Sequence, residues 1–217
     1  MLNSEIAARL RRWAQDPFEF LKEAVYTRDQ VDEEGPIKIA PAKLGYIYTL
    51  VRLWEHEDII VIHKSRRMWC SWLFISLYLW DILFHNERDI FFVSDVFKKS
   101  DSLVERAKFI FDHIPTDLWP LDLRPRMNRI EGEFSSLDPK HNSHIYAIAQ
   151  GKDQLRQETG SGLLFDEFGF WPLAKETYTA ARPIIQGGGR LTIISTSPEI
   201  ISSEPSFFQQ LVEDTIE

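Results

Sequence analysis

The 217-residue sequence contains one cysteine, no leader-like N-terminus and no excess of positive charge. The single cysteine, Cys70, excludes an internal disulfide framework and a cysteine-rich zinc site, which is typical of a reducing compartment. The first residues lack the basic and apolar segments of a signal peptide, so we expect a cytosolic protein. A net charge of −8 excludes a broad basic surface that coats nucleic acid. Any contact with DNA must therefore be local or shared among several subunits.

Long hydrophobic runs are scarce, and residues 68–84 form the main exception. Ser71, Ser76 and Asp81 interrupt this run, which is also short for a membrane span. We therefore predict a helix buried between a sheet and a covering layer, and no membrane partner. No internal repeat or low-complexity tract is present. With 44% hydrophobic residues, the chain is able to bury one sizeable core.

Two hydrophobic patterns divide the chain near residue 57. Residues 1–57 form a predicted helical N-terminal subregion, with helices at 4–15, 17–27 and 44–56. From 58 to 217 the pattern alternates between strands (59–63, 89–94, 143–149, 162–165 and 190–195) and helices (69–85, 96–113, 174–185 and 205–212). Residues 129–134 are a candidate added antiparallel strand. The alternation predicts an α/β fold with a mainly parallel sheet sandwiched by helices.

Two adjacent carboxylates, Asp166 and Glu167, follow the short apolar strand that begins at Gly162. This is the layout of a Walker B motif, in which one carboxylate holds Mg²⁺ and the next aligns a water on a γ-phosphate. About a hundred residues upstream, a basic loop at 64–71 follows the apolar run 59–62. Strand, basic loop, long helix, strand and Asp-Glu is the chain order of a nucleoside-triphosphate motor.

The basic loop contains no glycine, whereas most phosphate-binding loops are glycine-rich. Ser71 takes the position of the hydroxyl that meets Mg²⁺, but Trp69 and Cys70 stand where Gly-Lys is usual. Lys64, at the start of the loop, is able to fold back over the phosphates and supply the same charge. A basic turn without a ligand is the alternative interpretation. The candidate nucleotide-binding residues of the loop are Lys64, Ser65, Arg66, Arg67, Met68, Trp69, Cys70 and Ser71.

A further polar cluster, Ser195-Thr196-Ser197, follows the last predicted strand. Open parallel sheets bind ligands outside the carboxyl ends of their strands. We therefore expect this cluster to share one crevice with Lys64, Ser71, Asp166 and Glu167.

Together these residues resemble the large terminase subunits that package DNA into the heads of tailed phages and herpesviruses. The resemblance runs from about residue 44 to 211 and is carried by residues 64–71, 150–156, 166–171 and 195–198. One branch of the family places its loop lysine early, in a Lys-Ser-x-Arg-x-x-x-Ser pattern. Residues 64–71 fit that pattern position for position.

The resemblance implies a P-loop ATPase of the additional-strand type, which uses ATP and Mg²⁺ to move double-stranded DNA into a procapsid in the host cytoplasm. It assigns Lys64 to the β- and γ-phosphates, Ser71 and Asp166 to Mg²⁺, and Glu167 to the attacking water. Arg156 corresponds to the arginine finger of the family. A surface arginine in a polar loop is the alternative for that residue.

The resemblance also implies that Arg66 or Arg67 senses the γ-phosphate and that residues 195–197 couple hydrolysis to movement. The implied partners are double-stranded DNA, a portal protein, a small terminase subunit and further copies of the chain in a ring.

Two features depart from the family pattern. No glutamine precedes the loop to read adenine, so Tyr46 or Tyr48 is the candidate to stack on the base. Complete large terminases continue into a nuclease domain built around metal-binding acids, and Glu213 and Asp214 alone do not form such a site. We therefore expect the ATPase domain only. The alternatives are another nucleic-acid translocase, such as a helicase, and a degenerate P-loop module that binds partners without hydrolysis. The intact Asp166-Glu167 pair argues against the second.

Overall fold

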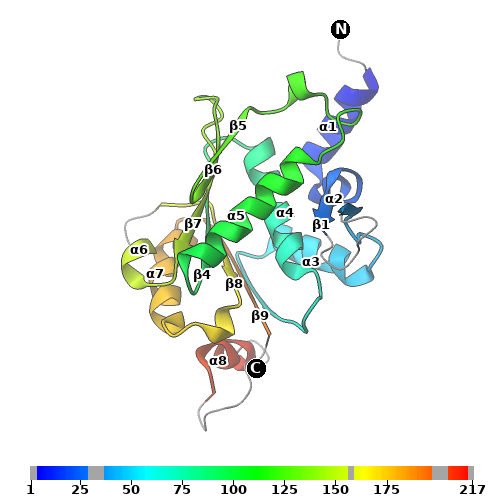
Figure 1. The fold of residues 1–217 in the computed structure, drawn as a ribbon. Coiled ribbons are helices and arrows are strands. Elements are labelled where there is room, and N and C mark those ends of the chain that lie inside the picture. Colours follow the sequence, from blue (N-terminus) through cyan, green and yellow to red (C-terminus); the bar gives the residue numbers. More distant parts are fainter. Residues whose placement is uncertain (1–3, 29–36, 156–158, 197–204, 215–217) are drawn as a thin grey trace.

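The computed structural model describes residues 4–28, 37–155, 159–196 and 205–214. Its centre is a seven-stranded sheet with the order β3-β9-β8-β4-β7-β6-β5 (Figure 1). The first five strands in that order are parallel, and they are β3 (Ile59–His63), β9 (Arg190–Ser195), β8 (Gly162–Asp166), β4 (Asp89–Ser94) and β7 (His144–Ala149). The antiparallel strands β6 (Glu133–Ser136) and β5 (Met127–Ile130) extend one edge.

Strand β9 lies between β3 and β8, although it is the last of the three in the chain. The register pairs His63 with Ser195, and Asp166 with Ile194, so the three strands end almost level with one another. Residues that follow these strands therefore emerge side by side at one edge of the sheet. This insertion of β9 between the two strands that precede the candidate nucleotide-binding residues is the arrangement expected of the additional-strand type.

Helices cover both faces of the sheet. One face packs against α4 (Cys70–Phe84) and, around it, α1 (Ser4–Gln15), α2 (Pro17–Ala24), α3 (Gly45–His56) and α5 (Phe97–Asp112). The other face packs against α6 (Lys152–Leu155), α7 (Ala174–Gln186) and α8 (Phe207–Asp214). Alternate strand residues feed the two cores: Phe92 belongs to the first cluster and Phe91 to the second.

Helix α4 is buried over almost its whole length, as the sequence predicts. It lies between the sheet and the layer made by the N-terminal helices and α5. Among the described helices, none is long and apolar enough to cross a membrane. The apolar run at residues 68–84 is therefore explained by burial within the protein.

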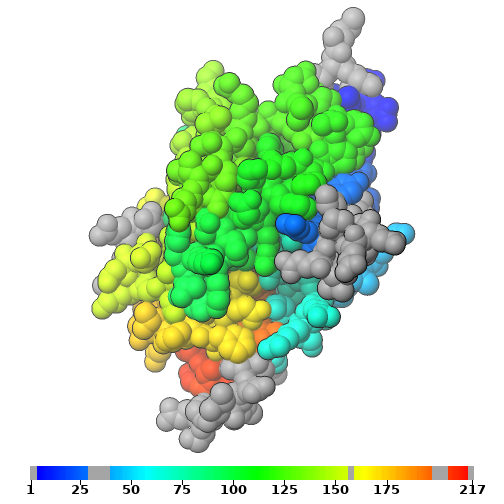
Figure 2. Space-filling view, in the orientation of Figure 1, coloured from blue at the N-terminus to red at the C-terminus, as the bar shows by residue number. Residues whose placement is uncertain are grey.

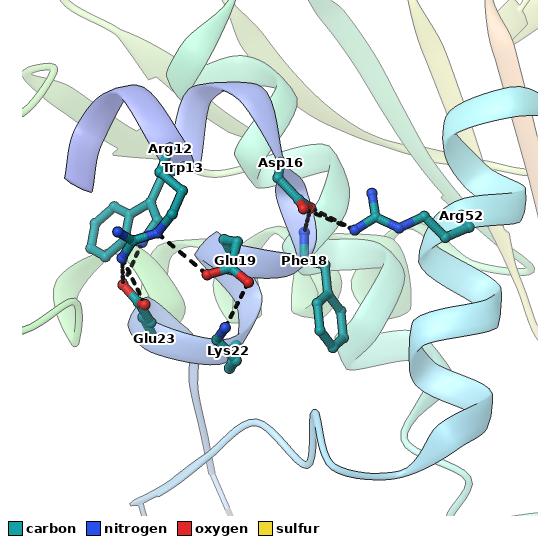
Figure 3. Close-up of polar contacts among 8 residues, drawn as sticks. All are labelled: Arg12, Trp13, Asp16, Phe18, Glu19, Lys22, Glu23 and Arg52. Atoms are coloured by element: carbon teal, nitrogen blue, oxygen red, sulfur yellow. Dashed lines mark hydrogen bonds and ion pairs between the residues drawn. The ribbon is translucent and has the colours of Figure 1, made fainter. Parts of the chain in front are cut away.

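The N-terminal corner is held by polar contacts between α1, α2 and α3 (Figure 3). Its members are Arg12, Trp13, Asp16, Phe18, Glu19, Lys22, Glu23 and Arg52. The Asp16 carboxylate caps α2 by accepting a hydrogen bond from the Phe18 backbone N–H at 2.8 Å. The same carboxylate accepts two hydrogen bonds from the Arg52 guanidinium, at 3.0 and 2.9 Å. Helix α3, which leads into β3, is thereby fixed to the first two helices.

Two sequence predictions were wrong in detail. The predicted helix at 17–27 stops at Ala24, and β1 (Tyr26–Arg28) pairs with β2 (Ile37–Ile39) instead. Aromatic and β-branched residues such as Tyr26 and Thr27 favour strands, which accounts for the change. The predicted single strand at 129–134 is part of a hairpin, whose turn contains Gly132 at φ +78°. The alternation of apolar and polar residues continues through the turn, so the sequence pattern did not indicate where the first strand ends.

Candidate active site

A pocket of about 370 Å³ lies at the carboxyl edge of the parallel strands. In the space-filling view, the segment after β8 (yellow) lies between the start of α5 (green) and the loop after β3 (turquoise) (Figure 2). All three segments contribute to the pocket, together with the end of β9. The lining residues are Lys64, Arg66, Arg67, Asp95, Lys99, Glu167, Phe170 and Thr196. Four of these eight side chains are basic, so the pocket favours an anionic ligand.

The glycine-free loop adopts backbone conformations that glycine usually supplies. Arg67 and Trp69 have φ angles of 61° and 60°, in the left-handed region. Each costs on the order of 1–3 kcal/mol and is typical of functional sites. Trp69 also precedes the first turn of α4, where no side chain caps the helix. The backbone N–H groups of that turn are therefore suited to an anion.

Tyr46, on α3, fixes the loop from behind by donating its hydroxyl to the Met68 carbonyl at 3.0 Å. Burial, and secondarily Cys70, raises the pKa of this phenol. Tyr48 instead packs edge-on against Phe18 and lies under the Arg52 guanidinium, 4.9 Å from it. Tyr46 thus contacts the candidate nucleotide loop, whereas Tyr48 packs against Phe18 and Arg52 of the N-terminal corner.

Ser71 and Asp166 meet across the site, since the Ser71 hydroxyl donates to Oδ1 of Asp166 at 2.8 Å. Burial raises the pKa of the Asp166 carboxyl, and Glu167 adds to this, whereas Ser71, Arg106 and Lys64 oppose it. These two side chains supply hard oxygen ligands. No cluster of three His, Cys, Asp or Glu residues suited to a metal occurs in the described ranges. One carboxylate and one hydroxyl fit Mg²⁺, which commonly completes its shell with phosphates and water.

Lys64 and Glu167 form the second pair, with Nζ of Lys64 3.1 Å from Oε1 of Glu167. The Lys64 side chain is only 8% exposed, whereas that of Glu167 is 43% exposed. The backbone N–H of Lys64 also bonds the Ser195 carbonyl at 3.0 Å, which fixes the start of the loop to β9. Glu167 has a φ of 56°, a third left-handed non-glycine residue at this edge. Thr196 approaches the other carboxylate oxygen, with Oγ1 at 3.5 Å.

The turn after Glu167 is packed closely against the end of β9. The backbone N–H of Gly169 donates to Oγ of the buried Ser195 at 2.9 Å. A Cβ at Gly169 would lie 2.9 Å from that oxygen and 3.2 Å from the Thr196 carbonyl, so only glycine fits there. The Trp171 indole holds the other side of the turn by donating to the Asp166 carbonyl at 3.1 Å. Ser195 therefore links β9 directly to the turn that carries Glu167.

The remaining predicted residues divide into three groups. Ser65, Arg66 and Arg67 are exposed on the loop. Cys70 is buried beneath it, and burial raises the pKa of its thiol. Arg156 and Ser197 lie outside the described residues.

Sequence reasoning missed Asp95, Lys99 and Phe170, which line the pocket. Asp95 follows β4 at the same carboxyl edge, so the rule that located the Ser195 cluster also applies to it. Lys99 forms an ion pair with Asp95 at 2.6 Å. Arg106 was missed as well, and it lies over the Trp72 ring at 5.5 Å. No sequence pattern marks Arg106, because its position depends on how α5 packs on α4.

No protein-family model and no curated protein matches the sequence. Several solved structures do match the structure of the chain. A variant of the large terminase ATPase domain of Thermus phage P74-26 matches with a TM-score of 0.57 and 12% identity, over 75% of this chain and 66% of that chain. The HK97 bacteriophage large terminase matches with a TM-score of 0.64 and 13% identity, over 94% of this chain and 41% of that chain. A large terminase from a thermophilic bacteriophage gives 0.53 and 14%, over 70% and 38%.

These matches show the fold. The chain has the α/β fold of phage large terminase ATPase domains, and the predicted α/β fold, with a mainly parallel sheet sandwiched by helices, is confirmed. The chain spans well under half the length of the HK97 protein.

Proposed function

We propose that this protein hydrolyses Mg-ATP as the ATPase module of a viral DNA-packaging motor of the large terminase type. The observation that supports this most strongly is the meeting of two pairs of side chains at one pocket. Ser71 contacts Asp166, and Lys64 contacts Glu167, although each pair is separated by about a hundred residues. A chain without a nucleotide to bind has no evident need for that convergence on a strained loop.

The phosphates bind between the loop and the start of α4. Lys64 leaves Glu167 and contacts the β- and γ-phosphates, where its charge offsets theirs. Arg66 and Arg67 lie at the mouth of the same pocket and contact the outer phosphate oxygens. The N–H groups of the first turn of α4 complete the cradle.

Ser71 and Asp166 are the residues that would hold Mg²⁺. When bound, the ion neutralises charge that develops on the phosphates during transfer. Asp166 is partly buried at the end of β8, which limits the orientations open to its carboxylate. The Ser71 hydroxyl fixes that orientation in the nucleotide-free protein.

Glu167 orients the attacking water once Lys64 has released it. The water oxygen forms a bond to the γ-phosphorus, the bond to the bridging oxygen breaks, and the proton of the water passes toward the carboxylate. Thr196 lies beside this carboxylate at the end of β9. We assign residues 195–197 to the coupling of hydrolysis to movement on that basis.

The motor function rests on the fold likeness and goes beyond it. In this proposal several copies form a ring on a portal protein in the host cell, a small terminase subunit assists, and double-stranded DNA passes through. Arg156 completes the site of a neighbouring copy. The net charge of −8 is consistent with DNA contacts that are small per subunit.

Phosphate release from Mg-ATP by the purified protein tests the proposal. The wild-type protein should hydrolyse ATP, slowly when dilute, and Glu167→Gln should bind Mg-ATP while hydrolysing it at least about 10²-fold more slowly. Glu176→Gln is the matched control, since Glu176 is exposed on α7 and does not line the pocket. A wild-type protein that binds no nucleotide, or equal turnover by Glu167→Gln, would contradict the proposal.

A further inference from the structure

Gln150 is the first residue after β7 and lies at the same edge of the sheet as the pocket. Its backbone N–H donates to the Ser94 carbonyl at the end of β4, at 2.8 Å. The pairing of Ala149 with Ser94 brings β7 and β4 to an end together. Gln150 therefore stands beside the loop between β4 and α5, one wall of the pocket.

The side-chain amide of Gln150 joins two segments that are distant in sequence. Its Nε2 donates to the Asp95 carbonyl at 3.2 Å, and its Oε1 accepts from the Leu173 backbone N–H at 2.8 Å. Asp95 belongs to the wall after β4, and Leu173 ends the turn that begins at Glu167. The amide offers both a donor and an acceptor, whereas an ionised carboxylate lacks the donor and an ammonium lacks the acceptor.

Leu173 is held at both of its backbone groups. Its carbonyl accepts from Oγ1 of Thr177 at 2.7 Å, and the same hydroxyl oxygen accepts from the Gly151 N–H at 2.9 Å. Gln150 thus contacts Leu173, at the far end of the turn, directly, and Gly151 contacts it through the Thr177 hydroxyl. The near end of the turn starts at Glu167, in the left-handed region.

We propose that Gln150 is a positioning residue for ATP hydrolysis, which fixes the turn carrying Glu167 against the wall that carries Asp95. This inference rests on the proposed function and adds a residue to it. The Glu167 carboxylate is 43% exposed and sits on a strained residue, so its position depends on contacts at both ends of the turn. Gly169 and Trp171 hold the near part, and Gln150 holds the far end. Gln150 does not line the pocket and acts only through the backbone that it contacts.

Gln150→Ala should reduce kcat about tenfold, because small displacements of a catalytic group reduce the rate strongly. The Kd for a non-hydrolysable Mg-ATP analogue should stay within about twofold, because the phosphate-binding residues belong to the loop after β3 and to α4. Gln186→Ala is the matched control. Gln186 is an exposed glutamine at the end of α7. The chain continues from there into the start of β9, at the edge of the sheet opposite to the pocket.

Gln150→Glu supplies a readout that a purely structural role would not change. The glutamate keeps the acceptor for Leu173 and loses the donor to the Asp95 carbonyl while it is ionised. Protonation restores the donor. The kcat of Gln150→Glu relative to wild type should therefore rise as the pH is lowered from about 8 to about 6, since a carboxyl facing a carbonyl has a raised pKa.

Unchanged kcat in both variants would overturn the inference. So would a parallel loss of kcat, nucleotide affinity and thermal stability, which would mean that Gln150 only supports the fold. If Gln150→Ala does not fold, the pH dependence of Gln150→Glu decides. A wild-type protein without hydrolysis would contradict the proposed function first, and this outcome is distinct from a wild-type protein that is active and insensitive to Gln150.

Discussion

The N-terminal corner and the carboxyl edge of the sheet both pair basic with acidic side chains, but they do so on different backbones. In the corner, Asp16 has an extended backbone, caps α2 and receives two hydrogen bonds from Arg52. At the edge, the Lys64–Glu167 contact involves a left-handed glutamate, and α4 begins without a side-chain cap. In the N-terminal corner, the polar groups form hydrogen bonds and ion pairs with one another. At the carboxyl edge of the sheet, basic side chains and backbone N–H groups face a pocket.

The two regions also differ in what their charges do to the folded state. Burial lowers the pKa of Arg52, but hydrogen bonds to Asp16 and Glu55 outweigh it, so its pKa is raised and its charge is stabilised. Burial raises the pKa of Asp166, so the ionised form of that carboxyl is disfavoured in the folded protein. We infer that the charged groups of the N-terminal corner increase the free energy of unfolding, whereas those at the carboxyl edge lower it as a consequence of their function.

Asp166→Asn should have the largest effect, and it should change activity and stability in opposite directions. Hydrolysis should fall by about 10²-fold or more, because a neutral amide replaces an anionic Mg²⁺ ligand. The free energy of unfolding at neutral pH should rise. Because folding raises the pKa of the Asp166 carboxyl, the protonated carboxyl adds to the stability of the wild-type protein at low pH. This contribution is lost as the pH rises through the pKa of the folded state. The advantage of the variant in urea unfolding should therefore disappear below about pH 4. A variant less stable than wild type at neutral pH would contradict this view of the edge.

Lys64→Ala should weaken Mg-ATP binding and hydrolysis together, by about tenfold or more in each, because its charge offsets the phosphates in both ground and transition states. Arg66→Ala and Arg67→Ala are matched comparisons on the same loop. Titration calorimetry and phosphate release measure the two effects. If each arginine variant proves worse than Lys64→Ala, the arginines carry the role assigned to the early lysine.

Asp16→Ala should show the opposite behaviour at the N-terminal corner. It removes the cap of α2 and the partner of Arg52, so the free energy of unfolding should fall by about 1–3 kcal/mol. ATP turnover at a temperature where the variant is folded should stay within about twofold of wild type. Asp117→Ala is the control, because Asp117 is exposed. A loss of turnover without a loss of stability would mean that the corner communicates with the pocket.

Arg67→Gly is expected to have the smallest effect and tests the backbone strain directly. Glycine adopts a positive φ without a penalty from Cβ, so the variant should gain up to about 1 kcal/mol of stability. Arg66→Gly should gain nothing, because Arg66 is not among the residues with a positive φ. Thermal unfolding of the two variants, side by side, measures the difference. Equal changes in both would remove the case for strain at Arg67.

The parallel strands were predictable because each is a short apolar run bounded by polar residues. Three of the five predicted bounds, at 59–63, 89–94 and 190–195, agree with the structure to the residue. Asp166 and Glu167 were located from the strand predicted at 162–165, which in the structure extends through Asp166. The assignment of roles to these residues stays a prediction.

The rest depends on contacts between segments that are distant in sequence. Phe170 and Lys99 join the pocket only because the turn after β8 and the start of α5 fold against the loop after β3. The two hydrogen bonds of the Gln150 amide likewise follow from the sheet order. The left-handed conformation of Trp69 was not predictable, since tryptophan rarely adopts it. In the folded chain, the Tyr46 hydroxyl holds the carbonyl of Met68, the residue before it.

A crystal structure with Mg²⁺ and a non-hydrolysable ATP analogue would show whether Lys64 binds the phosphates of the nucleotide. We expect Nζ of Lys64 to leave Oε1 of Glu167, from which it is 3.1 Å away in the nucleotide-free protein, and to lie within hydrogen-bonding distance of the β- and γ-phosphate oxygens. Ser71 and Asp166 should then both contact the ion. A nucleotide bound elsewhere, or bound in this pocket with Lys64 still on Glu167, would rule out the proposed role of Lys64.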